Sequence, residues 1–266
     1  METLKEIPRL FNIGDMMSCL DDKSGYDHIL LHENSRKYFG IQFGGFYLVF
    51  NTIPFGFKTS AYIYQTVGLV ATSYCRSLEV PCLQYIDDRW IGGWLGKKSF
   101  SKQSGIERKK DVQRCLYVFS EVLIRLGYFI NIEKSVFFIS TVIKFLGMLV
   151  DSIRLAFLIP ENKLDKFLAL RREIVSHDRV DINTLQKFAG KCISFLLAVP
   201  GAKCYTKVVN RAIGKACKNS GSVEITQVLR EEIRYWGFLQ DWTRCFLWRT
   251  ERHLQFAMAT DSSSYK

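Results

Sequence analysis

Residues 83–90, "LQYIDDRW", place two aspartates, Asp87 and Asp88, directly after a run of apolar and aromatic residues. Adjacent carboxylates repel each other, and each raises the pKa of its neighbour unless a cation lies beside them. A solvated hairpin tip would relieve this repulsion, with residues 83–86 as one strand and Trp90 on the return strand. A metal site would relieve it equally well. So short a motif does not distinguish the two structures by itself.

A second acidic motif, "CLDDKSGYDHILL" at residues 19–31, also places aspartate after apolar residues, and small residues and a tyrosine follow it. Its Asp21 lies 66 residues before Asp87. If the two segments are neighbouring strands of one sheet, their carboxylates converge. Hard cations such as Mg²⁺ prefer oxygen ligands and bridge phosphate groups. The two motifs together therefore favour a site for divalent cations and phosphorylated substrates.

The composition predicts a globular protein with an excess of positive charge. Of the 266 residues, 48% are hydrophobic and 24% are charged, which allows one large domain or two modest ones. Lysine and arginine number 37 against 26 acidic residues, so the net charge is +11. This charge favours a polyanionic partner, although a solvated basic surface would have the same composition.

The eight cysteines form no C-x-x-C pair and show no metal-ligand spacing, so neither a zinc site nor a disulfide framework is expected. We interpret them as reduced thiols of an intracellular protein. The most apolar long run, residues 136–150, contains Lys144 and is too short to span a bilayer. Residues 1–10 do not have the pattern of a signal peptide. We therefore expect no association with a membrane.

The spacing of apolar residues changes near residue 155. Before it, short β-type runs alternate with two segments of helical spacing, and after Pro160 the spacing is helical, with Asp181 or Asn183 as a helix cap. Residues 95–110 are expected to form a basic surface loop. The expected strands are 46–53, 82–86, 135–140, 144–150 and 254–262; the expected helices are 59–75, 111–126, one directly after Pro160, 181–199, 203–218 and 224–242.

The two acidic motifs belong to a series of five blocks along the chain: "LDDKSGYDHI", "NTIPFGFKTSAYIYQ", "YIDD", "LGYFINIEKS" and "KFLGMLVD". In order and approximate spacing they resemble retroelement reverse transcriptases, and "DDKSGYDHILL" and "YIDDRW" resemble those of DIRS-type retrotransposons most. The resemblance implies an α+β fold in which a polymerase palm, an antiparallel sheet backed by helices, is followed by an α-helical thumb. The implied domains are a palm with partial fingers at 1–155, the thumb at 156–222, a connecting helical segment at 223–256 and the start of a ribonuclease H-like domain at 257–266.

The resemblance also implies the catalytic residues. Asp21 and Asp87 would hold two Mg²⁺ ions, with Mn²⁺ as an alternative, and Asp88 would be the second acid of its motif. Two bound metals would lower the pKa of a primer 3'-hydroxyl and stabilise charge on the attacking and leaving oxygens. These three aspartates are therefore the candidate catalytic residues.

The same resemblance implies a site for a deoxynucleoside triphosphate. Tyr26 would lie beneath the incoming sugar and exclude a ribose 2'-hydroxyl, whereas a core tyrosine is the alternative. Asp22 is expected to be a turn carboxylate whose backbone contacts metal or phosphate. Some viral relatives have glutamine in place of Phe55. Lys134 matches a lysine near the leaving pyrophosphate, and an exposed lysine is an equally good interpretation. The candidate nucleotide-binding residues are Asp22, Lys23, Ser24, Gly25, Tyr26, Phe55, Gly56 and Lys134.

Three of the five blocks match the segments that contact primer and template in this family. The "PFGF" block pairs a proline turn with a glycine that allows close backbone approach. The residues of the other blocks are equally compatible with apolar core strands. The candidate primer and template residues are Pro54, Tyr85, Ile86, Phe145, Leu146 and Gly147.

Both ends of the chain depart from the family pattern. Only twenty residues precede Asp21, so we expect an N-terminally shortened polymerase that lacks part of its fingers. The segment "MATDSSSYK" resembles the first strand of a ribonuclease H domain, with Asp261 as its first acid. Because that chemistry needs several carboxylates around two metals, we expect no ribonuclease H activity.

The sequence therefore predicts an RNA-directed DNA polymerase of a retrotransposon. Its partners would be an RNA or DNA template, a DNA primer and deoxynucleoside triphosphates. The alternatives are a catalytically silent remnant that binds nucleic acid by charge, and a palm-fold nucleotidyltransferase that uses no template. The sequence predicts neither the oligomeric state nor the choice between nucleus and cytoplasm.

Overall fold

A computed structural model describes residues 2–10, 12–93, 105–199, 201–219, 221–242 and 246–248. The expected strand at 254–262 and the ribonuclease H-like segment with Asp261 lie outside these residues. Residues 105–110, expected to end a basic loop, instead form the first turns of a helix. Within the described part of the chain, no helix is both long enough and apolar enough to cross a membrane.

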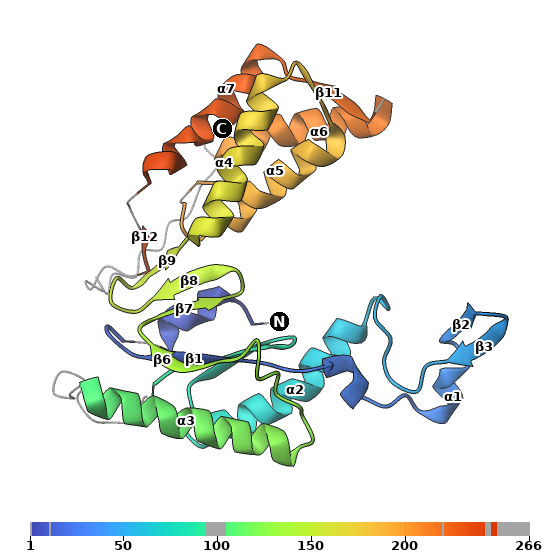
Figure 1. Ribbon diagram of the computed structural model, residues 1–266, viewed down its shortest axis with the longest axis vertical. Helices are drawn as coiled ribbons and strands as arrows, with labels where there is room; N and C mark the ends of the chain where they lie inside the picture. Colours follow the sequence, from blue (N-terminus) through green and yellow to red (C-terminus); the bar gives the residue numbers. More distant parts are fainter. Residues whose placement is uncertain are drawn as a thin grey trace, which may run out of the picture.

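A four-stranded antiparallel sheet forms the centre of the molecule. It contains β1 (Met17–Asp21), β4 (Cys82–Tyr85), β5 (Asp88–Ile91) and β6 (Val136–Ser140) in the order β4-β5-β1-β6. Two helices, α2 (Ser60–Ser77) and α3 (Gly105–Arg125), cover one face of this sheet (Figure 1). The α+β architecture predicted from the sequence, an antiparallel sheet backed by helices, is confirmed.

Alternation along the central strands divides their side chains between two hydrophobic clusters, because successive residues of a strand point to opposite faces. One cluster packs against α2 and α3, and the other lies on the opposite face of the sheet. The helix side receives Leu20, Cys82 and Ile91, and the opposite side receives Met17, Cys19, Leu83 and Trp90.

A second sheet connects the central sheet to the C-terminal part of the chain. It contains β7 (Val142–Phe145), β8 (Met148–Asp151), β9 (Ala156–Leu158) and β12 (Phe246–Leu247) in the order β12-β9-β8-β7. The turn between β7 and β8 contains Leu146 and Gly147, whose φ angles of 46° and 76° are typical of a two-residue hairpin turn.

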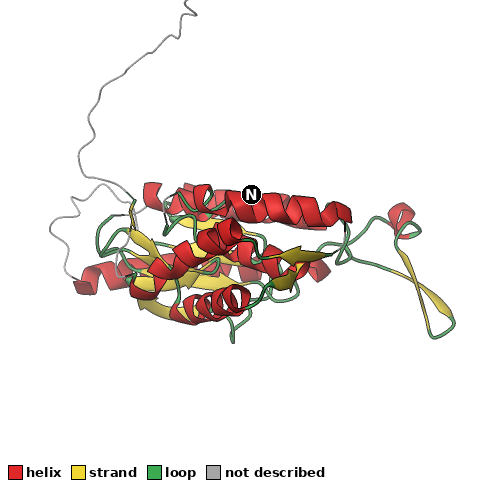
Figure 2. Ribbon diagram, turned by 90° about the horizontal axis from the view of Figure 1, so that it is seen from above, coloured by secondary structure: helices red, strands yellow, loops and turns green. Residues whose placement is uncertain are grey.

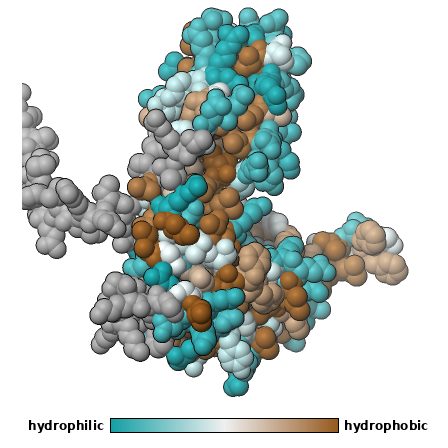
Figure 3. All heavy atoms as spheres, turned by 60° about the vertical axis from the view of Figure 1, so that its left-hand side comes forward, coloured by the Kyte–Doolittle hydropathy of each residue, from teal (hydrophilic) through white to brown (hydrophobic). Residues whose placement is uncertain are grey.

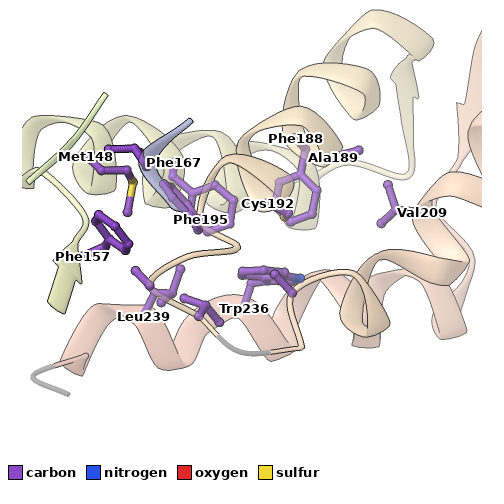
Figure 4. Close-up of a cluster of buried hydrophobic side chains, with 14 of the residues drawn as sticks. Met148, Phe157, Phe167, Phe188, Ala189, Cys192, Phe195, Val209, Trp236 and Leu239 are labelled. Carbon is purple, nitrogen blue, oxygen red and sulfur yellow. The ribbon is translucent and has the colours of Figure 1, made fainter. Parts of the chain in front are cut away.

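Residues 161–242 form a helical lobe. It consists of α4 (Glu161–Ser176), α5 (Ile182–Ser194), α6 (Lys207–Asn219) and α7 (Gln227–Tyr235), with the short 3-10 helices η4 (Cys204–Thr206) and η5 (Trp236–Asp241) and a small sheet of β10 (Arg179–Asp181) and β11 (Ser222–Glu224). The predicted cap is confirmed at Asp181, whose carboxylate accepts from Asn183 N at 2.9 Å. Phe167 packs on Phe188, Phe195 and Trp236 in the core of the lobe (Figure 4).

A hairpin of β2 (Gly40–Phe43) and β3 (Phe46–Val49) projects from the molecule beside the short helix α1 (Glu33–Arg36) (Figure 2). Its tip is apolar and exposed, with Phe43, Phe46 and Tyr47 at 75%, 72% and 84% exposure (Figure 3). The expected strand at 46–53 thus ends at Val49. Two further 3-10 helices are η1 (Leu4–Arg9) and η2 (Gly25–His28).

Candidate active site

Three candidate carboxylates meet where β1 and β5 lie side by side. Asp21 and Asp88 are direct partners in the antiparallel register of these strands, and Asp87 lies in the turn before β5. The Asp22 amide donates to the Asp87 carbonyl at 2.9 Å and ties the end of β1 to this turn. Like charges directly opposite each other in a sheet are unfavourable. The sequence thus places negative charge where a cation would relieve it.

Electrostatics at this position favour a bound cation. Burial, with the charges of Asp22, Asp21 and Asp88, raises the pKa of Asp87 to about 6, although Arg89 opposes the shift. Burial and then Asp21 likewise raise the pKa of Asp88. Asp87 Oδ1 is buried without a hydrogen-bond partner among the described residues. An unpaired buried carboxylate oxygen beside further carboxylates is the donor set that suits Mg²⁺.

The described residues contain no cluster of three or more His, Cys, Asp or Glu side chains already spaced to hold a metal ion. A magnesium site of this kind does not need one, because Mg²⁺ is commonly held by one or two carboxylates together with substrate phosphates and water. The residues present therefore fit a metal that binds together with a phosphorylated substrate.

Asp22 differs from the expected turn carboxylate, because its side chain is buried in an ion pair. Arg89 Nη2 lies 2.7 Å and Arg89 Nε 2.9 Å from the carboxylate oxygens, and the Tyr64 hydroxyl donates to Asp22 Oδ2 at 2.5 Å. Strand alternation explains the difference, since Asp21 and Asp22 point to opposite faces of the sheet. The Asp22 carboxylate is thus occupied by Arg89 and Tyr64.

Arg89 has no counterpart in the sequence-based list of site residues. Its guanidinium lies over the rings of Tyr128 at 4.9 Å and Phe119 at 5.8 Å. Burial alone would lower the pKa of Arg89, but its hydrogen bonds to Asp22 and the charge of that carboxylate outweigh burial and raise it. Arg89 is therefore a permanent positive charge beneath the acidic site.

The segment after Asp22 packs closely against Asp87. Ser24 has a left-handed backbone conformation, and a Cβ atom on Gly25 would overlap both Asp87 Oδ1 and the Tyr64 ring. Glycine at this position is therefore needed for the close approach. The Lys23 amide donates to the Phe129 carbonyl at 2.7 Å and the Asp22 amide to the Asp87 carbonyl, which leaves the amides of Ser24 and Gly25 as the candidates for phosphate.

Tyr26 and Phe55, from different sequence blocks, lie together in the structure. Their ring centroids are 4.6 Å apart, and Tyr64 contacts Tyr26 edge-on at 5.7 Å. The Pro54 carbonyl accepts from the Ser60 hydroxyl at 2.7 Å, which joins this block to the start of α2. Burial, followed by the charge of Asp87, raises the pKa of Tyr26. Gly56, with φ of 85°, follows Phe55 in the turn.

Lys134 lies beside the first acid of the site. Its Nζ is 3.9 Å from Asp21 Oδ1, and its side chain is 70% exposed. The next residue, Ser135, accepts a hydrogen bond from the Asp21 amide at 3.0 Å through its hydroxyl oxygen. The structure thus brings together the three sequence blocks that carry Asp21, Asp87 and Lys134.

The remaining candidate residues lie on two hairpin turns. Tyr85 ends β4 and Ile86 follows it in the β4–β5 turn, whereas Leu146 and Gly147 form the β7–β8 turn. Phe145 is buried in the core. Lys163 of α4 donates to the Gly147 carbonyl at 3.3 Å, so the helical lobe contacts the second turn.

The fold agrees with comparisons to known proteins. A comparison with curated proteins finds no match. Among solved structures, foamy viral protease-reverse transcriptase in complex with RNA/DNA hybrid is similar, with a TM-score of 0.62 and 17% identity over 88% of this chain and 28% of that chain. The same viral protein in complex with dsDNA has a TM-score of 0.63 and 17% identity over 91% of this chain and 45% of that chain.

The chain therefore spans less than half the length of these solved structures. The model of one protein family, reverse transcriptase (RNA-dependent DNA polymerase), matches residues 12–150. This match covers more than half of the sequence and contains Asp21, Asp87, Asp88 and Lys134. The chain belongs to the reverse transcriptase (RNA-dependent DNA polymerase) family.

Proposed function

We propose that this chain catalyses RNA-directed DNA synthesis by nucleotidyl transfer to a primer 3'-hydroxyl. The observation that carries the proposal is the convergence of Asp21, Asp87 and Asp88, with a buried, unpaired Asp87 oxygen. The amino-acid sequences of its two acidic motifs support an origin in a retrotransposon of the DIRS type.

Asp21 and Asp87 would hold two Mg²⁺ ions, and Mn²⁺ would be an alternative. When bound, the metals lower the pKa of the 3'-hydroxyl and stabilise charge on the oxygens that attack and leave. Asp88, opposite Asp21 in the sheet, adds negative charge that favours occupancy. Lys134 supplies a positive charge near the leaving pyrophosphate, where a cation or a proton donor assists departure.

The aromatic pair Tyr26 and Phe55 would form the wall beneath the incoming sugar. The Tyr26 ring is supported by Phe55 and Tyr64, so it cannot easily move aside for a 2'-hydroxyl group. The site therefore selects deoxynucleoside triphosphates. Because Phe55 has no polar group, it contacts the sugar through its ring alone.

Lysines at the junction of the helical lobe and the β7–β8 turn would contact the nucleic acid. Burial, together with the nearby charges of Lys191 and Lys144, lowers the pKa of Lys163, so both of these lysines lie close enough to affect Lys163. A phosphate backbone between them would relieve their repulsion without reading sequence. The net charge of +11 supports an RNA or DNA template with a DNA primer as the partner.

The test is primer extension with the purified chain, Mg²⁺, deoxynucleotides and a DNA primer annealed to an RNA template. Extension should be lost in Asp87→Asn and retained in Asp165→Asn, which makes the same chemical change at an exposed position of α4. Undiminished extension by Asp87→Asn would remove that residue from the catalytic site.

A second candidate function is nucleic-acid binding without catalysis, which the positive net charge favours by itself. This alternative predicts duplex binding that weakens steeply with salt, and no extension under any metal. Binding measured on the same samples therefore separates the two functions.

A further inference from the structure

Side chains cover the free edge of the central sheet, where β4 is the outer strand. Arg76 donates to the Cys82 carbonyl through Nε at 3.0 Å and Nη2 at 2.7 Å. Glu2 accepts from the Gln84 amide at 2.9 Å, and Gln65 Nε2 donates to the Gln84 carbonyl at 3.0 Å. The main-chain groups that an edge strand usually exposes to water are thus bonded to side chains, two of which belong to α2.

Two glutamines continue this pattern into the β4–β5 turn. Gln65 Oε1 accepts from the Ile86 amide at 2.6 Å, and Gln84 Nε2 donates to the Ile86 carbonyl at 3.2 Å. Both glutamines are buried, with 2% and 0% exposure. Each main-chain polar group of Ile86 is therefore bonded to the side-chain amide of a buried glutamine.

Ile86 has a backbone conformation that its side chain disfavours. Its φ is 53°, in the left-handed region where a β-branched residue is rare and strained. Such strain persists only where the surrounding structure over-determines it. Here the two glutamine amides are the contacts that hold the strained backbone of Ile86. This strained residue lies between Tyr85 and Asp87.

The helix is shaped to receive one of these amides. A Cβ atom at Gly68 of α2 would overlap the Gln84 amide, so a larger residue would displace it. The Thr72 hydroxyl lies 3.1 Å from Gln84 Oε1 and holds the other side of the group. Residues of α2 thus fix the Gln84 side chain on two sides, and its amide in turn bonds the Ile86 carbonyl.

We propose that Gln65 and Gln84 are positioning residues for catalysis. They hold Ile86 in its left-handed conformation, and this sets the direction in which Asp87 points toward the metal and Tyr85 toward the primer. The inference rests on the proposed function, since it concerns the geometry of the same carboxylate. Release of Ile86 to a negative φ would turn Asp87 away from Asp21 while leaving both acids present.

The test compares Gln65→Met, which keeps the length of the side chain and removes the amide, with Thr66→Val, the next residue of α2, whose exposed hydroxyl donates to the Tyr62 carbonyl of the same helix. In a single-turnover assay the amplitude gives the fraction of enzyme molecules that are active. The rate constant depends on how well the catalytic groups of those molecules are positioned. Gln65→Met should lower the rate about 10- to 100-fold with the amplitude and duplex affinity unchanged. Thr66→Val should change neither.

The Ile86→Gly background isolates the strain, because glycine adopts positive φ without cost. There, Gln65→Met should slow the reaction less than about threefold, since no strained residue needs to be held. An equal loss in both backgrounds, or a reduced amplitude at an unchanged rate, would overturn the positioning role and leave a structural one.

Mn²⁺ titration in the absence of nucleotide gives a readout that does not depend on polymerase activity. At a temperature where both proteins are fully folded, Gln65→Met should weaken Mn²⁺ binding at least threefold, and should accelerate hydrogen exchange at the Ile86 amide. If the wild-type chain extends no primer, the proposed function fails while this measurement still decides the inference. Unchanged Mn²⁺ affinity in Gln65→Met would overturn the proposed positioning role.

Discussion

Burial, together with three other carboxylates nearby, makes the charge of Asp87 unfavourable in the metal-free protein. Its raised pKa of about 6 means that the folded chain binds this proton more tightly than the unfolded chain does. The stabilisation from the protonated form is complete below the pKa of the unfolded chain, near 3.9, and is lost as pH rises through about 6. At neutral pH the metal-free protein therefore carries an electrostatic cost.

Asp87→Asn should remove that cost. In buffer with a metal chelator at pH 8, the variant should be more stable than the wild type by about 1–2 kcal/mol, after allowance for solvent screening at a half-buried group. The difference should shrink below pH 6 and vanish near pH 4. Thermal unfolding across this pH range measures it. Parallel stability curves for the two proteins would show that Asp87 ionises normally in the fold.

Loss of Arg89 should destabilise the fold. Arg89→Met leaves the Asp22 carboxylate buried with the Tyr64 hydroxyl as its remaining partner among the described residues, and breaking a buried pair from one side costs roughly 3–5 kcal/mol. Denaturant unfolding should show this loss. Arg125→Met, which removes an exposed pair with Glu121 on α3, is the matched control and should unfold at the wild-type midpoint.

At this scale the sequence predicts that Asp21 and Asp87 lie close together better than it predicts what surrounds them. The proximity of Asp21 and Asp87 follows from two motifs that share a strand-then-aspartate pattern. The burial of Asp22 does not follow from these motifs, because its partner Arg89 is 67 residues away and no local pattern marks the pair. Strict alternation along "LDD" is the signal that would have separated Asp21 from Asp22.

Among the elements, long segments with clear periodicity were predictable. In α3, Val112, Cys115, Phe119 and Leu123 are buried at helical spacing, as expected. The helix nevertheless begins at Gly105. The apolar pattern missed its first turns because they are mostly polar and exposed and lack an apolar stripe. The strands β9, β10 and β11 have three residues each, which is too short for a period to show.

The β2–β3 hairpin had a local signal that the strand analysis did not use. Gly44 and Gly45 both have positive φ and separate two apolar runs, the pattern of a two-residue hairpin turn. Its side chains are exposed on both faces, so alternation between an apolar and a polar face is absent. A two-stranded ribbon of this kind contributes little stability on its own. Its position therefore depends on the segments that lead into it.

Across the whole molecule, the buried core does not divide where the apolar pattern changes. One hydrophobic cluster lies between the central sheet and α2 and α3. The other begins on the opposite face of that sheet at Trp90, continues through Met148 and Phe157, and extends into the helical lobe at Phe167. The change of pattern near residue 155 marks a change of element type, while the core runs across it.

This continuity predicts how the molecule unfolds. Phe167→Ala should cost roughly 3–5 kcal/mol, as truncation of a fully buried aromatic residue does. Because its cluster reaches the second sheet, hydrogen exchange should accelerate in β8 and β9 together with α4 and α5, while α2 and α3 change least. Phe119→Ala, in the other cluster, should show the opposite distribution. Acceleration confined to residues 161–242 in Phe167→Ala would mean that the helical lobe is an independent unit, and that its contact with the β7–β8 turn transmits no stability.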